Sequence, residues 1–110
     1  MSSIAEIKID QDEDNVIISG SGALDLSNAD EFRTGLSLAS KAADQVTVDL
    51  RSATFIDTAI LEYLARAAKA MLERGKRLKV IVAENGHPQY VLETVGFPQL
   101  MDVEVVPVSL

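Results

Sequence analysis

The pattern of apolar and polar positions predicts a β-hairpin at the start of the chain. Ile4, Ile7 and Ile9 lie in a short apolar-rich run, and a second run begins with three apolar residues at 16–18. Between them, the sequence QDEDN at residues 11–15 is rich in residues that favour turns. A strand, an acidic turn and a second strand together indicate a hairpin.

Three further strands are predicted in the rest of the chain. Val46, Val48 and Leu50 alternate with polar residues, as in a strand with one buried face. The sequence LKVIVA at residues 78–83 is almost continuously apolar, which is typical of a parallel strand covered by helices. Valines at residues 103–106 predict a last short strand.

Helical spacing of apolar residues predicts three helices between these strands. The first covers residues 25–40, with Ser27 as its N-cap. The second covers residues 58–74, and Gly75 suits the position just after its end. The third runs from Pro88 to residue 95 and is closed by Gly96. The apolar stripe of the second helix consists of Leu61, Leu64, Ala68, Met71 and Leu72.

This order of elements predicts an α/β fold, a small open mixed sheet with an N-terminal hairpin and helices mainly on one face. With 110 residues and 47% hydrophobic residues, the chain suits a single domain spanning residues 1–110.

Composition excludes several classes of function. A formal net charge of −7 disfavours binding to nucleic acid or, unaided, to an anionic membrane. The chain has no cysteine, which excludes disulfides, thiolate metal sites and thiol nucleophiles. No run is apolar enough for a signal peptide or for direct membrane insertion, so we predict a cytoplasmic protein.

The most informative chemistry lies where the third strand runs toward the second helix. Asp57 and Thr58 place a carboxylate and a modifiable hydroxyl at a predicted helix N-terminus. A phosphate on Thr58 would add about −1.5 to −2 charge beside Asp57. The alternative interpretation is structural, because Asp and Thr are ordinary helix caps.

Other candidate sites are weaker. His87 is the only histidine, it lacks further metal-binding neighbours, and its place before Pro88 suggests a loop or a helix cap. The run Ser-Gly-Ser-Gly at residues 19–22 lacks the lysine of a phosphate-binding loop. No arrangement of nucleophile and base is visible, so we predict a non-enzyme with no metal and no cofactor.

Three segments resemble the STAS domain, the fold of bacterial anti-sigma factor antagonists and of the cytoplasmic tails of sulfate transporters. Residues 22–25 (GALD), followed by Ala29 and Phe32, resemble the family's turn into its first helix. Residues 48–50 (VDL) and 55–58 (FIDT) resemble its strand and its Asp-Ser/Thr phosphorylation motif. Residues 91–97, VLETVGF, resemble its last helix and closing glycine. Together the segments span nearly the whole chain.

The resemblance implies roles for particular residues. Thr58 falls on the position that a serine kinase phosphorylates, and Asp57 on the neighbouring carboxylate that helps to contact that kinase. The implied partner surface consists of Asp25 and residues 57–60, Asp57, Thr58, Ala59 and Ile60. Ile60 departs from the family, which commonly has glycine there, so its side chain is expected either to block a close approach or to anchor a different partner.

The resemblance also implies the leading function and its alternatives. An anti-sigma factor antagonist in a bacterial partner-switching pathway would bind an anti-sigma factor serine kinase, with a histidine-kinase-like ATPase fold, and so control transcription. Phosphorylation would release it, and a phosphatase would reset it. One alternative is a non-catalytic STAS subunit that braces the ATPase of a lipid-transporting ABC complex, where similar proteins carry Asp-Thr-Ala near the helix start. A stress-signalling scaffold and, in distant family members, a nucleotide-binding domain remain further alternatives.

Overall fold

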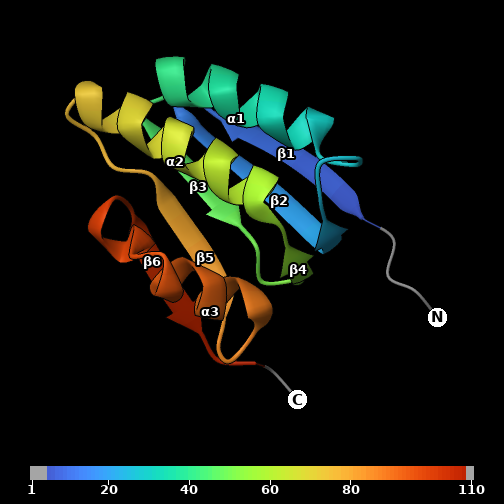
Figure 1. The fold of residues 1–110 in the computed structure, drawn as a ribbon. Helices are drawn as coiled ribbons and strands as arrows, with labels where there is room; N and C mark the ends of the chain where they lie inside the picture. The colour runs from blue at the N-terminus through green and yellow to red at the C-terminus, as the bar shows by residue number, and fades with distance from the viewer. Residues whose placement is uncertain (1–4, 109–110) are drawn as a thin grey trace.

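The structure is a computed structural model that describes residues 5–108, so Ile4 of the predicted first strand lies outside the described residues. The strands are β1 (Glu6–Asp12), β2 (Asn15–Leu24), β3 (Gln45–Asp49), β4 (Ala53–Ile56), β5 (Lys79–Ala83) and β6 (Asp102–Val106). The helices are α1 (Asp30–Ala42), α2 (Thr58–Glu73) and α3 (His87–Thr94), and a 3-10 helix, η1 (Phe97–Gln99), follows α3 (Figure 1).

The strands form one mixed sheet in the order β1-β2-β3-β5-β6, with β4 paired to β2. β1 and β2 are antiparallel and form the predicted hairpin. β2 has 10 residues and also pairs with two other strands, β3 and β4. Its first half pairs in parallel with β3, and its last residues, Gly22–Leu24, pair in parallel with β4. The predicted α/β fold with an open mixed sheet is therefore confirmed.

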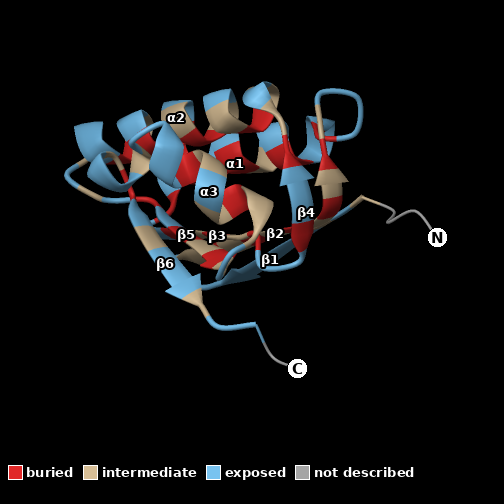
Figure 2. Cartoon of the chain, turned by 60° about the horizontal axis from the view of Figure 1, so that its bottom comes forward, coloured by how far each residue is buried: buried red, intermediate tan, exposed pale blue. Residues whose placement is uncertain are grey.

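All three helices pack on one face of the sheet, and no described residues form a layer on the other face (Figures 1 and 2). β2 shows how the sequence produces this arrangement, because its residues alternate between buried and partly exposed. Successive side chains of a strand point to opposite faces. Ile18 and Leu24 are fully buried beneath the helices, whereas Ser19 and Ser21 belong to the partly exposed set on the open face.

The hydrophobic core lies between the sheet and the helices. Phe32 of α1 and Leu64, Ala68 and Met71 of α2 have no exposed surface, which confirms the predicted buried stripe of α2. The other two predicted members differ: Leu61 is only partly buried, and Leu72 is 39% exposed.

Helix α1 begins later than the sequence predicted. It starts at Asp30, its N-cap is Ala29, and the expected cap Ser27 lies in the preceding loop. Residues 25–28 instead form a turn closed by their own side chains: the Ser27 amide donates to Asp25 Oδ1 at 2.9 Å, and the Asp25 amide donates to Asn28 Oδ1 at 3.0 Å. Such local bonds to the backbone compete with helix formation.

Strand β4 was not predicted from the sequence. It has four residues, of which the two in the middle are exposed, so it shows no alternation of apolar and polar positions. It is a strand because the end of β2 offers it a partner. The ends of α2 and α3 lie within one residue of the predictions: α2 ends at Glu73 before Gly75, α3 ends at Thr94 before Gly96, and both glycines have positive φ. The hairpin turn is shorter than predicted, because β1 continues to Asp12 and β2 begins at Asn15.

Candidate functional site

Asp57 is the N-cap of α2 and holds three backbone amides. Its Oδ1 accepts hydrogen bonds from the amides of Ala59 at 3.0 Å and Ile60 at 3.3 Å, in the first turn of the helix. Its Oδ2 accepts a third, at 3.2 Å, from the amide of Leu26 in the loop between β2 and α1. The carboxylate therefore fixes the start of α2 and ties it to the loop that contains Asp25.

Thr58 is the first residue of α2, and its side chain is exposed. A modifying enzyme could reach this hydroxyl without opening the fold. The helix N-terminus beside it is already occupied, because the amides of Ala59 and Ile60 are bonded to Asp57. A phosphate on Thr58 would therefore add negative charge beside the Asp57 carboxylate. Because the two amides already donate to Asp57, they would not be free to bond to the phosphate.

Asp25 lies in the same corner of the molecule, in the turn next to Leu26. Its Oδ1 accepts hydrogen bonds from the hydroxyl of Ser27 at 2.5 Å and from the Ser27 amide at 2.9 Å. Both bonds lower the pKa of Asp25 below its ordinary value, and the bond from the Ser27 hydroxyl has the largest effect. The region around the start of α2 therefore carries a second stable negative charge. The structure thus brings the loop of Asp25 together with residues 57–59.

Ile60 does not fit the expectation of a surface anchor. Its side chain has 0% exposure and belongs to the core beneath the first turn of α2. The helical period explains this burial, because Ile60 and Leu64 are four residues apart and share the inner face of α2. Ile60 is therefore a core residue that neither blocks nor anchors a partner at the surface.

Two exposed apolar side chains in the segments that meet at Asp57 were not identified from the sequence. Leu26 is 69% exposed in the loop that Asp57 holds, and Phe55 is 43% exposed in β4, three residues before Thr58. Neither lies in a periodic pattern that marks it as a surface residue. Leu26, Phe55 and Thr58 are here called the docking surface: all three are exposed, and they belong to the segments that meet at Asp57.

Removal of the Asp57 cap is a direct test of how this corner is held. Asp57→Ala is expected to lower the free energy of unfolding by about 1–2 kcal/mol, because two first-turn amides and the Leu26 amide lose their acceptor. Urea unfolding followed by circular dichroism measures this loss. Asp30→Ala, in the exposed first turn of α1 and not a cap, is the matched control and should change stability by about 0.5 kcal/mol or less. Equal effects of the two changes would contradict the capping role.

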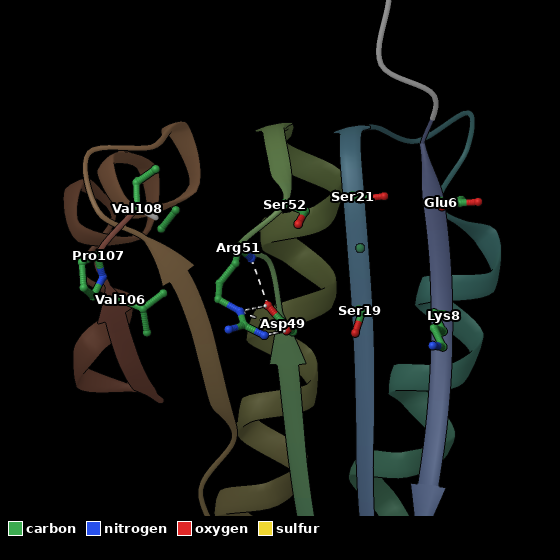
Figure 3. A pocket seen from close by; sticks show the side chains of 12 residues that line it. Glu6, Lys8, Ser19, Ser21, Asp49, Arg51, Ser52, Val106, Pro107 and Val108 are labelled. Carbon is green, nitrogen blue, oxygen red and sulfur yellow. Dashed lines mark hydrogen bonds and ion pairs between the residues drawn. The ribbon is translucent and has the colours of Figure 1, made fainter. Parts of the chain in front are cut away.

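A second surface feature lies on the open face of the sheet. A shallow hollow of about 500 Å³ extends from Lys8 of β1, past Ser19 of β2, to residues 106–108 at the end of β6 (Figure 3). At its centre, Arg51 bonds to Asp49 through Nε at 3.0 Å and Nη2 at 2.7 Å. The two central charges therefore neutralise each other, and the hollow has no unpaired cation at its centre.

The ion pair in this hollow gives a prediction about pH. Hydrogen bonding from Arg51 lowers the pKa of Asp49, so the ionised carboxylate stabilises the fold above the ordinary aspartate pKa. That contribution disappears as the pH falls through the lowered value. Arg51→Ala should raise the pKa of Asp49 toward its ordinary value, measured by NMR titration of the carboxyl carbon. Arg33→Ala, which removes the exposed partner of Asp30 in α1, should leave the Asp49 titration unchanged.

The described part of the chain holds no cluster of three or more His, Asp or Glu side chains suited to a metal ion. Within residues 5–108, no helix is long and apolar enough to cross a membrane.

Comparisons with known proteins agree with this architecture. A family model described as "Mlab, STAS domain" matches residues 7–104. No curated protein sequence matches the chain significantly.

Solved structures with a similar fold include anti-sigma factor antagonists. One from Mycobacterium paratuberculosis superposes with a TM-score of 0.79 at 14% identity, over 94% of this chain and 90% of that chain. SpoIIAA in its unphosphorylated form gives a TM-score of 0.75 at 13% identity, over 94% and 89% of the two chains. A STAS domain antagonist from Rhodobacter sphaeroides gives 0.51 at 17% identity, over 71% and 86%. At such identities the likeness establishes the fold. Together with a family model that covers residues 7–104, it shows that this chain belongs to the STAS domain family.

Proposed function

We propose that this chain is a non-catalytic regulator of the anti-sigma factor antagonist type. It binds a kinase-type anti-sigma factor through the docking surface while Thr58 is unmodified. Phosphorylation of Thr58 releases it, and a phosphatase restores binding. The observation that carries the proposal is the exposed Thr58 at the first position of α2, beside a carboxylate that is already held in place.

The local charges support release by phosphorylation. Asp57 lies directly before Thr58, Asp25 lies in the adjoining loop, and Glu62 lies one helical turn further along α2. Glu62 is paired with Arg66, so a phosphate would enter a surface where two carboxylates, Asp25 and Asp57, have no cationic partner among the described residues. Within an interface such a group must lose water and would repel any acidic group of the partner. The apolar side chains of Leu26 and Phe55 favour binding of the unmodified form, because they gain from removal of water.

The proposal assigns the phosphoryl chemistry to the partner. ATP and magnesium belong to the kinase, and this chain supplies only the acceptor hydroxyl. The oxygen of Thr58 would form a bond to the γ-phosphorus of ATP as the bond to ADP breaks, and the hydroxyl proton would pass to a base of the kinase.

A kinase assay with purified proteins tests this function. The protein is incubated with the ATPase of histidine-kinase-like fold encoded nearest to it, with labelled ATP and magnesium. Wild type and Thr54→Ala should take up about one phosphate per chain, whereas Thr58→Ala should take up none. Thr54 is the matched control, since it is an exposed threonine four residues away in β4. Labelling of Thr58→Ala at the wild-type level would refute the choice of Thr58.

A second candidate function is favoured by the family model that matches, whose description names Mlab. In this alternative the chain is a structural subunit of a lipid-transporting ABC complex, and the Asp57-Thr58-Ala59 corner contacts the ATPase subunit without turnover of phosphate. Co-purification separates the two candidates. An ABC ATPase that is retained by wild type and lost from Thr58→Ala, with no phosphate on Thr58, would favour the transporter subunit.

A further inference from the structure

The only histidine of the chain holds the strand that leads into the docking surface. His87 Nδ1 accepts a hydrogen bond from the backbone amide of Ile56 at 3.2 Å. The imidazole also stacks on the ring of Phe55, with centroids 4.6 Å apart and an angle of 24° between the planes. One side chain from the start of α3 therefore fixes the last two residues of β4, directly before Asp57.

The topology of the sheet explains why β4 needs this contact. β4 pairs with β2 alone among the described strands, so its other edge has no strand beside it. The amide of Asp57 bonds to Leu24 of β2, whereas the preceding amide, that of Ile56, bonds to His87. His87 thus supplies the acceptor that a neighbouring strand supplies elsewhere in a sheet.

This bond restricts the protonation state of the ring. Nδ1 can accept a hydrogen bond only while it carries a lone pair, which requires a neutral imidazole with its proton on Nε2. A protonated ring has donors at both nitrogens and would face the Ile56 amide with a hydrogen in place of a lone pair. Protonation must therefore break the bond or displace the end of β4.

Few charged groups surround the ring. Helix α3 packs on β4, β5 and η1. β4 and η1 carry no charged residue, and β5 carries one, Lys79, at its first residue, whereas its last residue leads toward His87. Asp57 follows β4, but its carboxylate already accepts hydrogen bonds from three backbone amides. Glu84 lies between β5 and α3 and is exposed. Glu93 lies near the opposite end of α3 from His87.

We propose that His87 is a proton-sensitive positioning residue, whose neutral form holds Phe55 and the Asp57-Thr58 corner in place for docking. Loss of a proton from the ring locks β4 against α3, and gain of a proton releases it. The consequence for binding rests on the proposed function of the docking surface. The hydrogen bond between His87 and Ile56, here called the latch, is a property of this chain and is measured without a partner.

NMR spectroscopy of the full chain tests the latch. At about pH 8, long-range nitrogen correlations should show the ring proton on Nε2. As the pH is lowered, the amide signals of Ile56, Asp57 and Thr58 should shift together with the ring signals of His87. A neutral ring with its proton on Nδ1, or a ring that titrates while these amides stay still, would overturn the proposal.

Hydrogen exchange on variants provides the second measurement. His87→Ala should speed exchange of the Ile56 amide by about tenfold, because it loses one hydrogen bond. His87→Asn keeps an oxygen acceptor near the position of Nδ1, so it should restore slow exchange while removing the pH response of residues 56–58. Unchanged exchange in His87→Ala, or a pH response that persists in His87→Asn, would assign the effect to another group. Because these measurements need no kinase, their failure would leave the labelling assay on Thr58 unaffected.

Discussion

Phosphorylated protein is expected to bind the proposed anti-sigma factor partner roughly thirtyfold to several thousandfold more weakly than unmodified protein, which corresponds to about 2–5 kcal/mol. The reason lies in the local geometry. Thr58 is exposed at the start of α2, and the first-turn amides of Ala59 and Ile60 are already bonded to Asp57. The added charge therefore remains available to repel the partner and must lose water in the interface.

The fold should survive this modification. A negative group in the first turn of a helix interacts favourably with the helix dipole, and repulsion from Glu62 one turn away opposes it by only a few tenths of a kcal/mol. Thermal melts of wild type, Thr58→Glu and phosphoprotein should therefore nearly coincide. The Glu side chain carries one charge and lacks the tetrahedral oxygens of a phosphate. Thr58→Glu should therefore weaken binding less than phosphorylation does.

Isothermal titration of the partner with these proteins and with Thr58→Ala measures the effect on affinity. Thr54→Glu is the matched control, since it adds the same charge at an exposed threonine in β4. Equal weakening by Thr54→Glu and Thr58→Glu would point to general charge repulsion. Phosphoprotein that binds as tightly as wild type would leave Thr58 as a helix-start residue without a switching role.

Leu64→Ala is expected to destabilise the fold by about 2–5 kcal/mol. Leu64 lies in the middle of α2, has 0% exposure and packs in the core between the helices and the sheet. Truncation removes apolar contacts and leaves a cavity that rigid neighbours fill only in part. The loss appears as a lower midpoint of urea unfolding at an unchanged slope.

Leu72→Ala is the matched control for this measurement. It makes the same chemical change in the same helix, and therefore the same change in helix propensity, at a residue that is 39% exposed. Its expected effect is about 1 kcal/mol or less. Equal destabilisation by the two variants would contradict the placement of Leu64 in the core.

The sequence was informative where the determining interactions are local. Helix α2 has its apolar stripe within its own residues and its cap and closing glycine within two residues of its ends, so its start at Thr58 and its buried face at Leu64 and Met71 were predictable. Ile60 shows the limit of family resemblance. A position expected at the surface is a core position here, and the helical period by itself places it with Leu64.

Local signals misled where side chains compete for the same backbone. Asp25 and Ser27 are good helix-start residues, yet their hydrogen bonds close a turn, and α1 begins only at Asp30. A helix N-terminus and a turn of this kind use the same residue types, so the sequence does not distinguish between them.

The sequence by itself determined the α/β class, the hairpin, the helix that begins at Thr58 and the carboxylate that caps it, because these depend on periodicity and on contacts within a few residues. Tertiary structure alone decided that β4 is a strand, since its only partner among the described strands is the end of β2. It also decided the shape of the docking surface. The bond from Leu26 to Asp57 and the bond from Ile56 to His87 each join residues 31 positions apart. No local pattern encodes such contacts, because they form only when the sheet brings the loop after β2, the end of β4 and the start of α3 to the same corner.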